Sequence, residues 1–96
     1  MNKIKILIPA YNDWQSVFKL LENINHEIST LECEFSVLIV NDASTKDRPD
    51  LTVNLDNLKS VQIINMKENR GHARCIASGL KYIYEKKEFD YVIPMD

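Results

Sequence analysis

The feature that most constrains the fold is the order of two apolar segments with a helical pattern between them. Residues 35–40 are nearly all apolar, and residues 3–10 alternate between polar and apolar before they become wholly apolar. Both patterns are typical of strands, and the first is typical of a strand covered on both faces. Between them, apolar residues recur at steps of three and four, as in an amphipathic helix: Val17, Leu20, Leu21, Ile24 and Ile28. This alternation of strand and helix favours a parallel sheet with a helical crossover.

The second half of the chain repeats the alternation. Residues 61–66 predict a third strand, residues 72–87 a second amphipathic helix, and residues 91–95 a short fourth strand. Residues 51–58 are too weakly periodic for a helix and are expected to be irregular or to form one or two turns. If the fourth strand lies on the other side of the first, right-handed crossovers give the strand order 3-2-1-4. The predicted fold class is α/β, a Rossmann-like three-layer fold with a mainly parallel four-stranded sheet.

The loops after the strands are expected to carry the functional residues, because parallel α/β sheets bind ligands beyond the carboxyl ends of their strands. Pro9 cannot donate a backbone hydrogen bond, so pairing is expected to stop there and to leave residues 10–12 in the loop. Asn12 or Asp13 is expected to cap the first helix. With the order 3-2-1-4, one edge of the sheet would bring together Tyr11, Asp42 and Asp96.

Composition and charge disfavour several classes of protein. A formal net charge of -2 gives no electrostatic reason to bind nucleic acid. No apolar run approaches the roughly 20 residues that span a membrane, and none resembles a signal-peptide core, so a cytoplasmic location is expected. The only glycines, Gly71 and Gly79, cannot form a glycine-rich dinucleotide or phosphate loop. Cys33 and Cys75 have no potential metal ligand or redox partner near them in sequence and are expected to be reduced.

Four segments, in the correct order along the chain, resemble motifs of the inverting family 2 glycosyltransferases. They are Ile8-Pro9-Ala10-Tyr11-Asn12, Val40-Asn41-Asp42-Ala43-Ser44-Thr45-Lys46-Asp47, Asn69-Arg70-Gly71-His72-Ala73-Arg74 followed by Gly79, and Tyr91-Val92-Ile93-Pro94-Met95-Asp96. The resemblance covers almost the whole chain and implies a GT-A fold. Of the Asp-x-Asp metal motif of that family, only the first aspartate, Asp96, is present. Residues 1–96 would therefore be a single partial domain, the nucleotide-sugar-binding half of a glycosyltransferase.

The resemblance implies roles for residues at the strand ends. Asp42 would accept a hydrogen bond from the N3–H of uracil, although an aspartate after a strand also commonly makes an Asx-turn. Tyr11 would stack on the base or ribose, or else cover the end of the sheet. Arg70 and Arg74 would bind the pyrophosphate close to Gly71, or this segment would be an ordinary solvated helix start. The residues expected to bind the nucleotide are Pro9, Ala10, Tyr11, Asn12, Asp42, Arg70, Gly71, Arg74 and Asp96.

The resemblance also implies the reaction and its cofactor. The reaction would move a sugar from a UDP-sugar donor to an acceptor hydroxyl with inversion. Mg²⁺ or Mn²⁺ would bind Asp96 and the diphosphate in the intact enzyme, whereas one carboxylate supplies too few ligands for tight metal binding by this chain alone. The acceptor site and the catalytic base would lie in a C-terminal part outside this sequence. No catalytic residue is therefore assigned, and the chain is expected to be inactive alone.

Three further expectations concern surfaces, variants and the alternative function. The surface on which the rest of the domain would pack should be apolar and should favour a homo-oligomer. Asp42→Ala is expected to weaken nucleotide binding and to leave the fold intact.

The alternative function is that of a non-catalytic or receiver-like α/β interaction module. A receiver-like domain would have an acidic pair after its first strand, where this chain has Tyr11-Asn12-Asp13.

Overall fold

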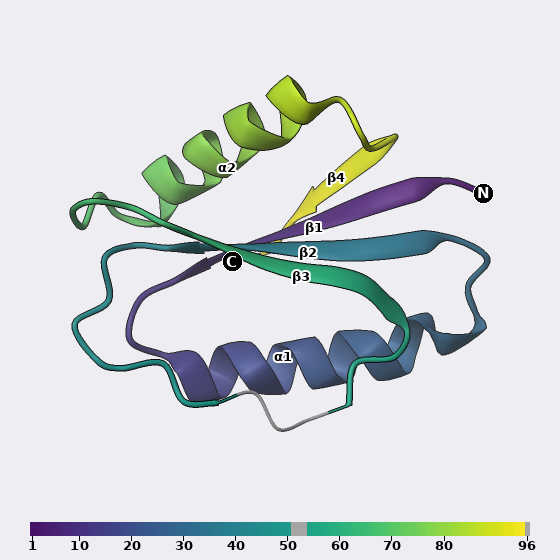
Figure 1. The fold of residues 1–96 in the computed structure, drawn as a ribbon, viewed down its shortest axis with the longest axis horizontal. Coiled ribbons are helices and arrows are strands. Elements are labelled where there is room, and N and C mark those ends of the chain that lie inside the picture. Colours follow the sequence, from purple (N-terminus) through teal and green to yellow (C-terminus); the bar gives the residue numbers. More distant parts are fainter. Residues whose placement is uncertain (51–53, 96) are drawn as a thin grey trace.

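The computed structural model describes residues 1–50 and 54–95, which form a sheet and two long helices (Figure 1). The elements in chain order are β1 (Lys3–Ala10), α1 (Trp14–Glu27), a 3₁₀ turn (Ile28–Thr30), β2 (Glu34–Asn41), β3 (Leu58–Asn65), α2 (His72–Lys86) and β4 (Tyr91–Pro94). Each described strand pair is parallel, and the sheet order is β3-β2-β1-β4. The predicted α/β class and the strand order 3-2-1-4 are therefore confirmed.

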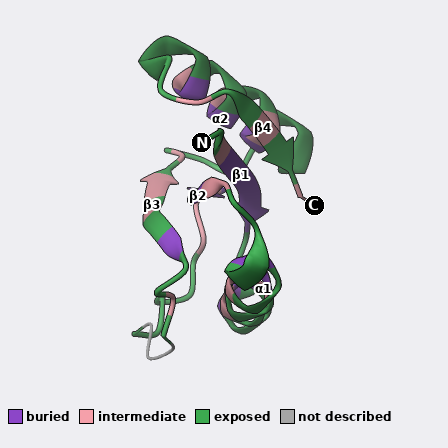
Figure 2. Ribbon diagram, turned by 90° about the vertical axis from the view of Figure 1, so that its right-hand side faces the viewer, coloured by how far each residue is buried: buried purple, intermediate pink, exposed green. Residues whose placement is uncertain are grey.

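The sheet is the middle of three layers, with α1 on one face and α2 on the other (Figures 1 and 2). Side chains of β1 and β2 alternate between the two faces, so each strand contributes to two cores. The core beside α1 includes Ile6, Ile8, Val17, Leu21, Val37 and Ile39. The core beside α2 contains Leu7, Leu38, Val40, Cys75 and Ile83. Burial on both faces explains why the two central strands are almost continuous apolar runs.

Gly79 lets α2 lie close to the sheet. A Cβ atom at this position would be 2.4 Å from Cδ1 of Leu7 and 3.0 Å from Cγ2 of Val40. Both neighbours belong to the packed core, which leaves little room for adjustment. The absence of a side chain at Gly79 therefore fixes how near α2 comes to β1 and β2.

The helices agree with the prediction in extent but not in capping. α2 ends at Lys86, one residue before the predicted end, and α1 begins at Trp14. Asp13 occupies the N-cap position of α1 without a side-chain capping hydrogen bond. The predicted cap is therefore wrong, and the side chain of Asn12 bonds to a different loop, as the next section describes.

β3 begins at Leu58, three residues before the predicted start at Val61. It is an edge strand that pairs only with β2, so its outer positions can be polar, and Lys59 and Ser60 are exposed. A search for apolar periodicity misses such residues. Residues 54–57 contain a turn, in agreement with the expectation for this connection, while residues 51–53 lie outside the described residues.

Pairing does not stop at Pro9, which corrects the prediction. β1 continues to Ala10, and both residues stay in register with β2. Proline is tolerated because every second residue of a strand faces the same neighbour: Leu7 accepts a hydrogen bond from Met95 at 2.8 Å, so Pro9 faces the same side. Pairing with β4 has ended there, since Leu7 is the last residue of β1 in register with it. The loop therefore begins at Tyr11.

Two further sequence expectations can be compared with the structure. Both cysteines are free thiols, as expected, and Cys75 is fully buried while Cys33 is half-buried. Within residues 1–50 and 54–95, neither helix has the length and apolar character needed to cross a membrane.

Candidate functional site

The carboxyl ends of β1, β2 and β3 meet at one edge of the sheet, on the left of Figure 1. Their last residues, Ala10, Asn41 and Asn65, lie in register. The backbone contacts continue beyond them, because the Asp42 N–H donates to the Ala10 carbonyl and the Met66 N–H to the Asn41 carbonyl, both at 2.8 Å. The three loops that follow therefore leave the sheet side by side. We term this edge the carboxyl rim and define it as residues 10–13, 41–48 and 65–74.

Asp42 lies buried within the carboxyl rim and is 1% exposed. Its Oδ1 accepts a hydrogen bond from the Arg70 N–H at 2.7 Å, and its Oδ2 accepts one from the Gly71 N–H at 2.8 Å. Its backbone carbonyl accepts a bond from Nδ2 of Asn69 at 3.3 Å. Asp42 therefore joins the loop after β2 to the loop before α2, and these long-range bonds replace the local Asx-turn considered as the alternative.

The surroundings of Asp42 keep its carboxylate ionised. Burial alone would raise its pKa, but hydrogen bonds from the Arg70 and Gly71 amides and the Cys75 thiol, with the charge of His72, lower the pKa below its ordinary 3.8. Burial, with the hydrogen bond to Asp42 and its charge, raises the pKa of Cys75 to about 11. Cys75 is therefore a neutral thiol at neutral pH and donates to Asp42. Each carboxylate oxygen has a backbone donor, which makes burial of the charge tolerable.

Asn12 makes a second connection across the carboxyl rim. Its Oδ1 accepts hydrogen bonds from the backbone N–H groups of Thr45 at 2.8 Å and Lys46 at 2.9 Å. Its Nδ2 donates to Oγ1 of Thr45 at 3.0 Å, and its backbone N–H donates to Oγ of Ser44 at 2.9 Å. We term these four hydrogen bonds the Asn12 clamp. It holds the loop after β1 against the loop after β2.

Asn41 extends the clamp towards β3. Its Oδ1 accepts hydrogen bonds from the backbone N–H of Ser44 at 3.1 Å and from the Ser44 hydroxyl, and its Nδ2 donates to Oδ1 of Asn65 at 2.9 Å. Asn41, and not Asp42, therefore makes the local turn after β2. Within that turn Ala43 has a φ of 57°, a left-handed conformation that costs a residue with a Cβ atom roughly 1–2 kcal/mol.

Three of the predicted nucleotide-binding residues present exposed side chains. Tyr11 is 40% exposed and directly precedes Asn12. Arg74 lies in the first turn of α2 and forms no ion pair with any residue that the structure describes. Arg70 is also exposed, but it pairs with Glu68. Of these three side chains, Tyr11 and Arg74 are therefore the two that have no such pairing and remain available to a ligand.

The other predicted site residues contribute in different ways. Pro9 and Ala10 are buried in β1, so their side chains form part of the core. Gly71 has a φ of 88°, which favours glycine, and its N–H is bonded to Asp42. Asp96 lies outside the described residues. Among the residues that are described, no group of three or more His, Cys, Asp or Glu could hold a metal ion.

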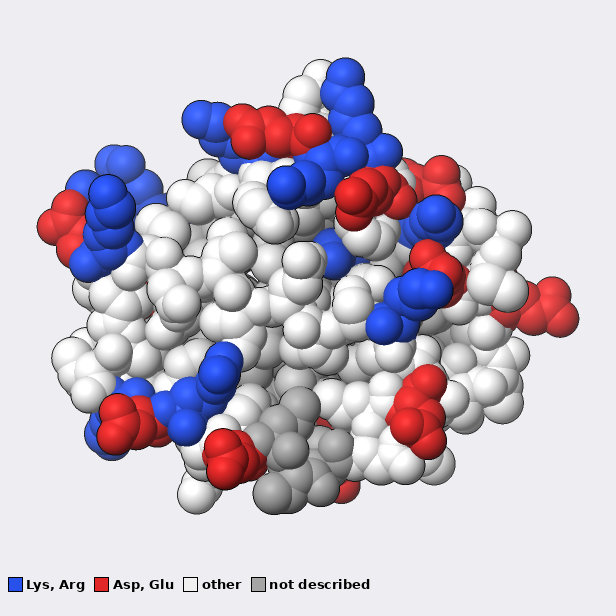
Figure 3. All heavy atoms as spheres, in the orientation of Figure 1, with Lys and Arg blue, Asp and Glu red and all other residues white. Residues whose placement is uncertain are grey.

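A hollow of about 440 Å³ opens at the carboxyl rim beside the start of α1. It is lined by Trp14, Asn41, Lys46, Asp47, Arg48 and Asn65. The indole N–H of Trp14 is buried and has no hydrogen-bond partner among residues 1–50 and 54–95. On the face shown in Figure 3, basic and acidic side chains are mixed and no broad region has one sign. The lining of the hollow is thus polar and includes both basic and acidic side chains, Lys46, Asp47 and Arg48.

Sequence reasoning missed four residues that organise the site: Asn41, Ser44, Thr45 and Cys75. The spacing of Asn41 and Ser44 is a signal for a side-chain turn that could have been used. The partners of Thr45 and Cys75 are Asn12 and Asp42, and each lies 33 residues earlier in the chain. Such contacts depend on the strand order, so no local sequence pattern predicts them.

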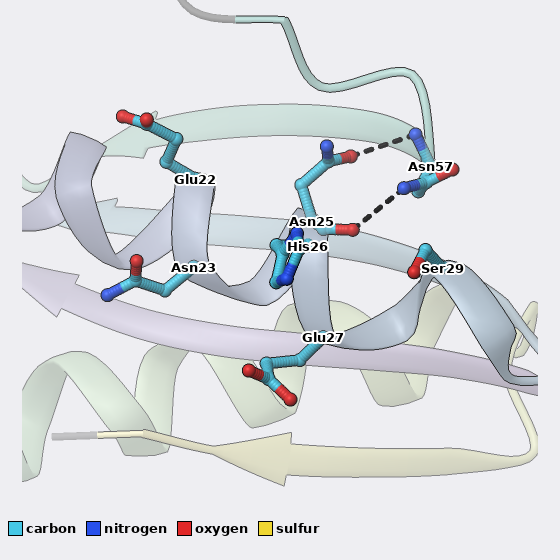
Figure 4. A pocket seen from close by; sticks show the side chains of 7 residues that line it. All are labelled: Glu22, Asn23, Asn25, His26, Glu27, Ser29 and Asn57. Atoms are coloured by element: carbon cyan, nitrogen blue, oxygen red, sulfur yellow. Dashed lines mark hydrogen bonds between the residues drawn. The ribbon is translucent and has the colours of Figure 1, made fainter.

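A second hollow, of about 580 Å³, lies by the C-terminal half of α1 (Figure 4). It is lined by Glu22, Asn23, Asn25, His26, Glu27, Ser29 and Asn57. Oδ1 of Asn25 accepts the Asn57 N–H at 2.8 Å, and Nδ2 of Asn57 donates to the Asn25 carbonyl at 2.8 Å. Its ionisable side chains are all exposed on one helix. This hollow therefore lacks the buried charge that characterises the carboxyl rim.

Comparison with known proteins adds independent information. The chain is 26% identical over 96 residues to the undecaprenyl-phosphate 4-deoxy-4-formamido-L-arabinose transferase of Proteus mirabilis. The aligned region covers 100% of this chain and 29% of that protein. It is 33% identical over 75 residues to the teichoic acid poly(glycerol phosphate) polymerase of Staphylococcus epidermidis, covering 76% of this chain and 10% of that protein. The chain therefore spans less than a third of the length of either relative. No solved structure matches it significantly.

The family comparison covers nearly the whole chain. The model of the family described as Glycosyl transferase family 2 matches residues 5–96, a range that includes every loop of the carboxyl rim. The match favours the transferase over the receiver-like alternative and agrees with the α/β sheet in the order 3-2-1-4. The chain belongs to glycosyl transferase family 2, and its fold is the Rossmann-like arrangement of a GT-A domain.

Proposed function

We propose that this chain forms the donor-nucleotide-binding part of an enzyme that transfers a sugar from a UDP-sugar to an acceptor hydroxyl with inversion. The observation that carries the proposal is the convergence of three loops at the carboxyl rim, joined by Asn12 and Asp42 next to the exposed ring of Tyr11. Ligands of parallel α/β sheets bind at this edge. Three of the four segments that resemble the family motifs therefore lie along the carboxyl rim, while Asp96 of the fourth lies outside the described residues.

The exposed groups of the rim suit the two halves of a nucleotide. The ring of Tyr11 would stack on the base or ribose, a contact worth about 1–3 kcal/mol. Arg74 would bind the diphosphate, helped by the positive end of α2, whose first turn contains no acidic residue. Contact between Asp42 and the N3–H of uracil remains a prediction. It requires the base to approach a carboxylate whose oxygens already accept two backbone N–H groups.

A divalent metal ion is expected to assist the departure of the diphosphate. Mg²⁺ or Mn²⁺, held through Asp96 in the longer enzyme, would neutralise the departing diphosphate. The described residues supply no three-ligand set for such an ion, so we assign no step to it. No catalytic base is assigned to these residues either. The 96-residue chain is therefore expected to bind UDP without transferring a sugar.

The acceptor is proposed only by its reacting group, a hydroxyl. The names of the two relatives specify undecaprenyl phosphate in one case and poly(glycerol phosphate) in the other. This chain covers only 29% and 10% of those proteins. A match to both relatives therefore does not select one acceptor over the other.

Titration with UDP, CDP and GDP in the presence of Mg²⁺ tests the donor proposal. We expect UDP to shift the amide resonances of residues 11, 41–46 and 70–74 in NMR spectra of the 96-residue chain, and to bind more tightly than CDP or GDP in calorimetry. Shifts confined to the surroundings of Asn25, or no shifts at all, would refute the proposal. Equal affinities for UDP and CDP would refute only the preference for uracil.

The expected homo-oligomer is also tested directly. Apolar side chains are exposed on α2 and β4, including Leu80 at 40%, Tyr84 at 76% and Tyr91 at 59%. We predict that the chain self-associates at high concentration through this surface and that Tyr84→Lys reduces the association. Light scattering measures it, and a wild-type monomer at the highest attainable concentration would contradict the prediction.

A further inference from the structure

The side chain of Asn12 is committed to the protein on both of its polar atoms. Oδ1 accepts two backbone N–H groups, and Nδ2 donates to a hydroxyl. All three partners belong to Thr45 and Lys46, in the loop after β2. The residue is also half-buried. Both acceptor sites of Oδ1 are therefore in use, and a ligand could contact the side chain without breaking a bond only through the second N–H of Nδ2, whereas an indirect role requires no change.

The conformation of Asn12 explains why asparagine suits this position. Its φ is 58°, in the left-handed region, which asparagine enters at lower cost than most residues with a Cβ atom. Glycine would adopt the same φ but could not accept the Thr45 and Lys46 amides. Alanine would satisfy neither requirement. Aspartate would keep an acceptor for both amides, and the Thr45 hydroxyl could donate to it.

We infer that Asn12 is a positioning residue of the donor site, which holds the loops after β1 and β2 in the geometry that the nucleotide needs without touching the nucleotide itself. The inference rests on the proposed function, because it assumes that the carboxyl rim binds a nucleotide. It refines the expectation that Asn12 is a nucleotide-binding residue.

The Asn12 clamp constrains the backbone of the loops after β1 and β2. Asn12 directly follows Tyr11, whose ring is exposed, and so fixes the backbone that carries it. Through Ser44 the clamp reaches Asn41, and through Asn41 it reaches Asn65 at the end of β3. A rim ordered before binding loses less conformational entropy when the ligand arrives. Loss of the clamp should therefore lower affinity more than it lowers global stability.

Three variants of the 96-residue chain test the inference. Asn12→Gly removes the side chain without straining the left-handed φ, and Asn12→Asp keeps the acceptor. Asn25→Ala is the matched control, because Asn25 makes a comparable clamp with Asn57 at the opposite end of the sheet (Figure 4). UDP affinity is measured by calorimetry, global stability by urea denaturation, and the order of the loop by hydrogen exchange at the Thr45 and Lys46 amides.

Asn12→Gly removes three hydrogen bonds between the two loops, and we expect it to weaken UDP binding about tenfold and to accelerate exchange at both amides. Asn12→Asp should stay within about threefold of the wild type, and Asn25→Ala should bind UDP as the wild type does. Wild-type affinity in Asn12→Gly, or an equal loss in Asn12→Gly and Asn12→Asp, would overturn the inference alone. If the wild-type chain does not bind UDP, the proposed function fails and the inference fails with it.

Discussion

The two ends of the sheet use the same kind of contact with different results. At the carboxyl rim, Asn12 accepts two backbone N–H groups from a distant loop, and at the opposite end Asn25 accepts that of Asn57. The hollow beside Asn25 is the larger, about 580 Å³ against about 440 Å³. Of the described carboxylates, however, Asp42 at the rim is the buried one. A buried carboxylate with a backbone donor on each oxygen therefore sets the proposed binding end apart, whereas the volume of a hollow does not.

The sharpest test of this comparison is Asp42→Ala. The substitution leaves the N–H groups of Arg70 and Gly71 without their acceptor in a partly buried place, so we expect it to lower the free energy of unfolding by about 3 kcal/mol. This prediction differs from the sequence-based expectation that the variant keeps the fold intact, because Asp42 bonds to two backbone amides of another loop. Urea denaturation measures the change. A loss below about 1 kcal/mol would show that the buried charge does not organise this end.

The same carboxylate predicts a pH dependence. Its pKa is lowered in the folded state, so its stabilising contribution is fully present above the ordinary value of 3.8 and is lost as the pH falls through the folded-state pKa. Wild-type stability should therefore fall on acidification below pH 3.8, and Asp42→Asn should flatten that part of the curve. Parallel curves for the two proteins would indicate that other carboxylates control acid unfolding.

The next test removes the side chain of Asn25, at the end of the sheet opposite the carboxyl rim. Asn25→Ala loses the hydrogen bonds to Asn57 N–H and to the Asn54 carbonyl, but alanine favours the helix, so we expect a net loss of about 0.5–1 kcal/mol. UDP affinity should not change, and calorimetry decides this. If Asn25→Ala weakened UDP binding as much as Asn12→Gly, the two ends would not differ in function and the comparison would break.

The smallest expected effect concerns the strained turn at the rim. Ala43 adopts a φ of 57°, and Ala43→Gly would remove the steric cost while adding freedom to the unfolded chain. The two effects oppose each other, so we expect a gain of about 0.5 kcal/mol in the free energy of unfolding. Thermal and urea denaturation measure it. A clear destabilisation would show that the methyl group of Ala43 makes a contact worth more than the strain.

The sequence predicted the fold more fully than the site. The strand order and the two helices follow from apolar periodicity and from the handedness of crossovers, and they are confirmed. The start of β3 was missed because an edge strand tolerates Lys59 and Ser60 on its exposed side. Asn12 or Asp13 was expected to cap α1, since both residue types are common caps. Asp13 does occupy the N-cap position but makes no side-chain capping bond, and the side chain of Asn12 bonds to Thr45 and Lys46 instead.

What the amino-acid sequence determined by itself is the set of elements and the three loops that share an edge, because these depend on local patterns and on general rules of sheet topology. What only the tertiary structure decided is which polar groups in those loops bond to one another. The partners of the Asp42 carboxylate are 28, 29 and 33 residues away, and those of Asn12 are 32 to 34 residues away. Hydrogen bonds of this kind depend on distances of a few tenths of an ångström, which are set by the packing of α2 and the sheet and not by any neighbour in the sequence.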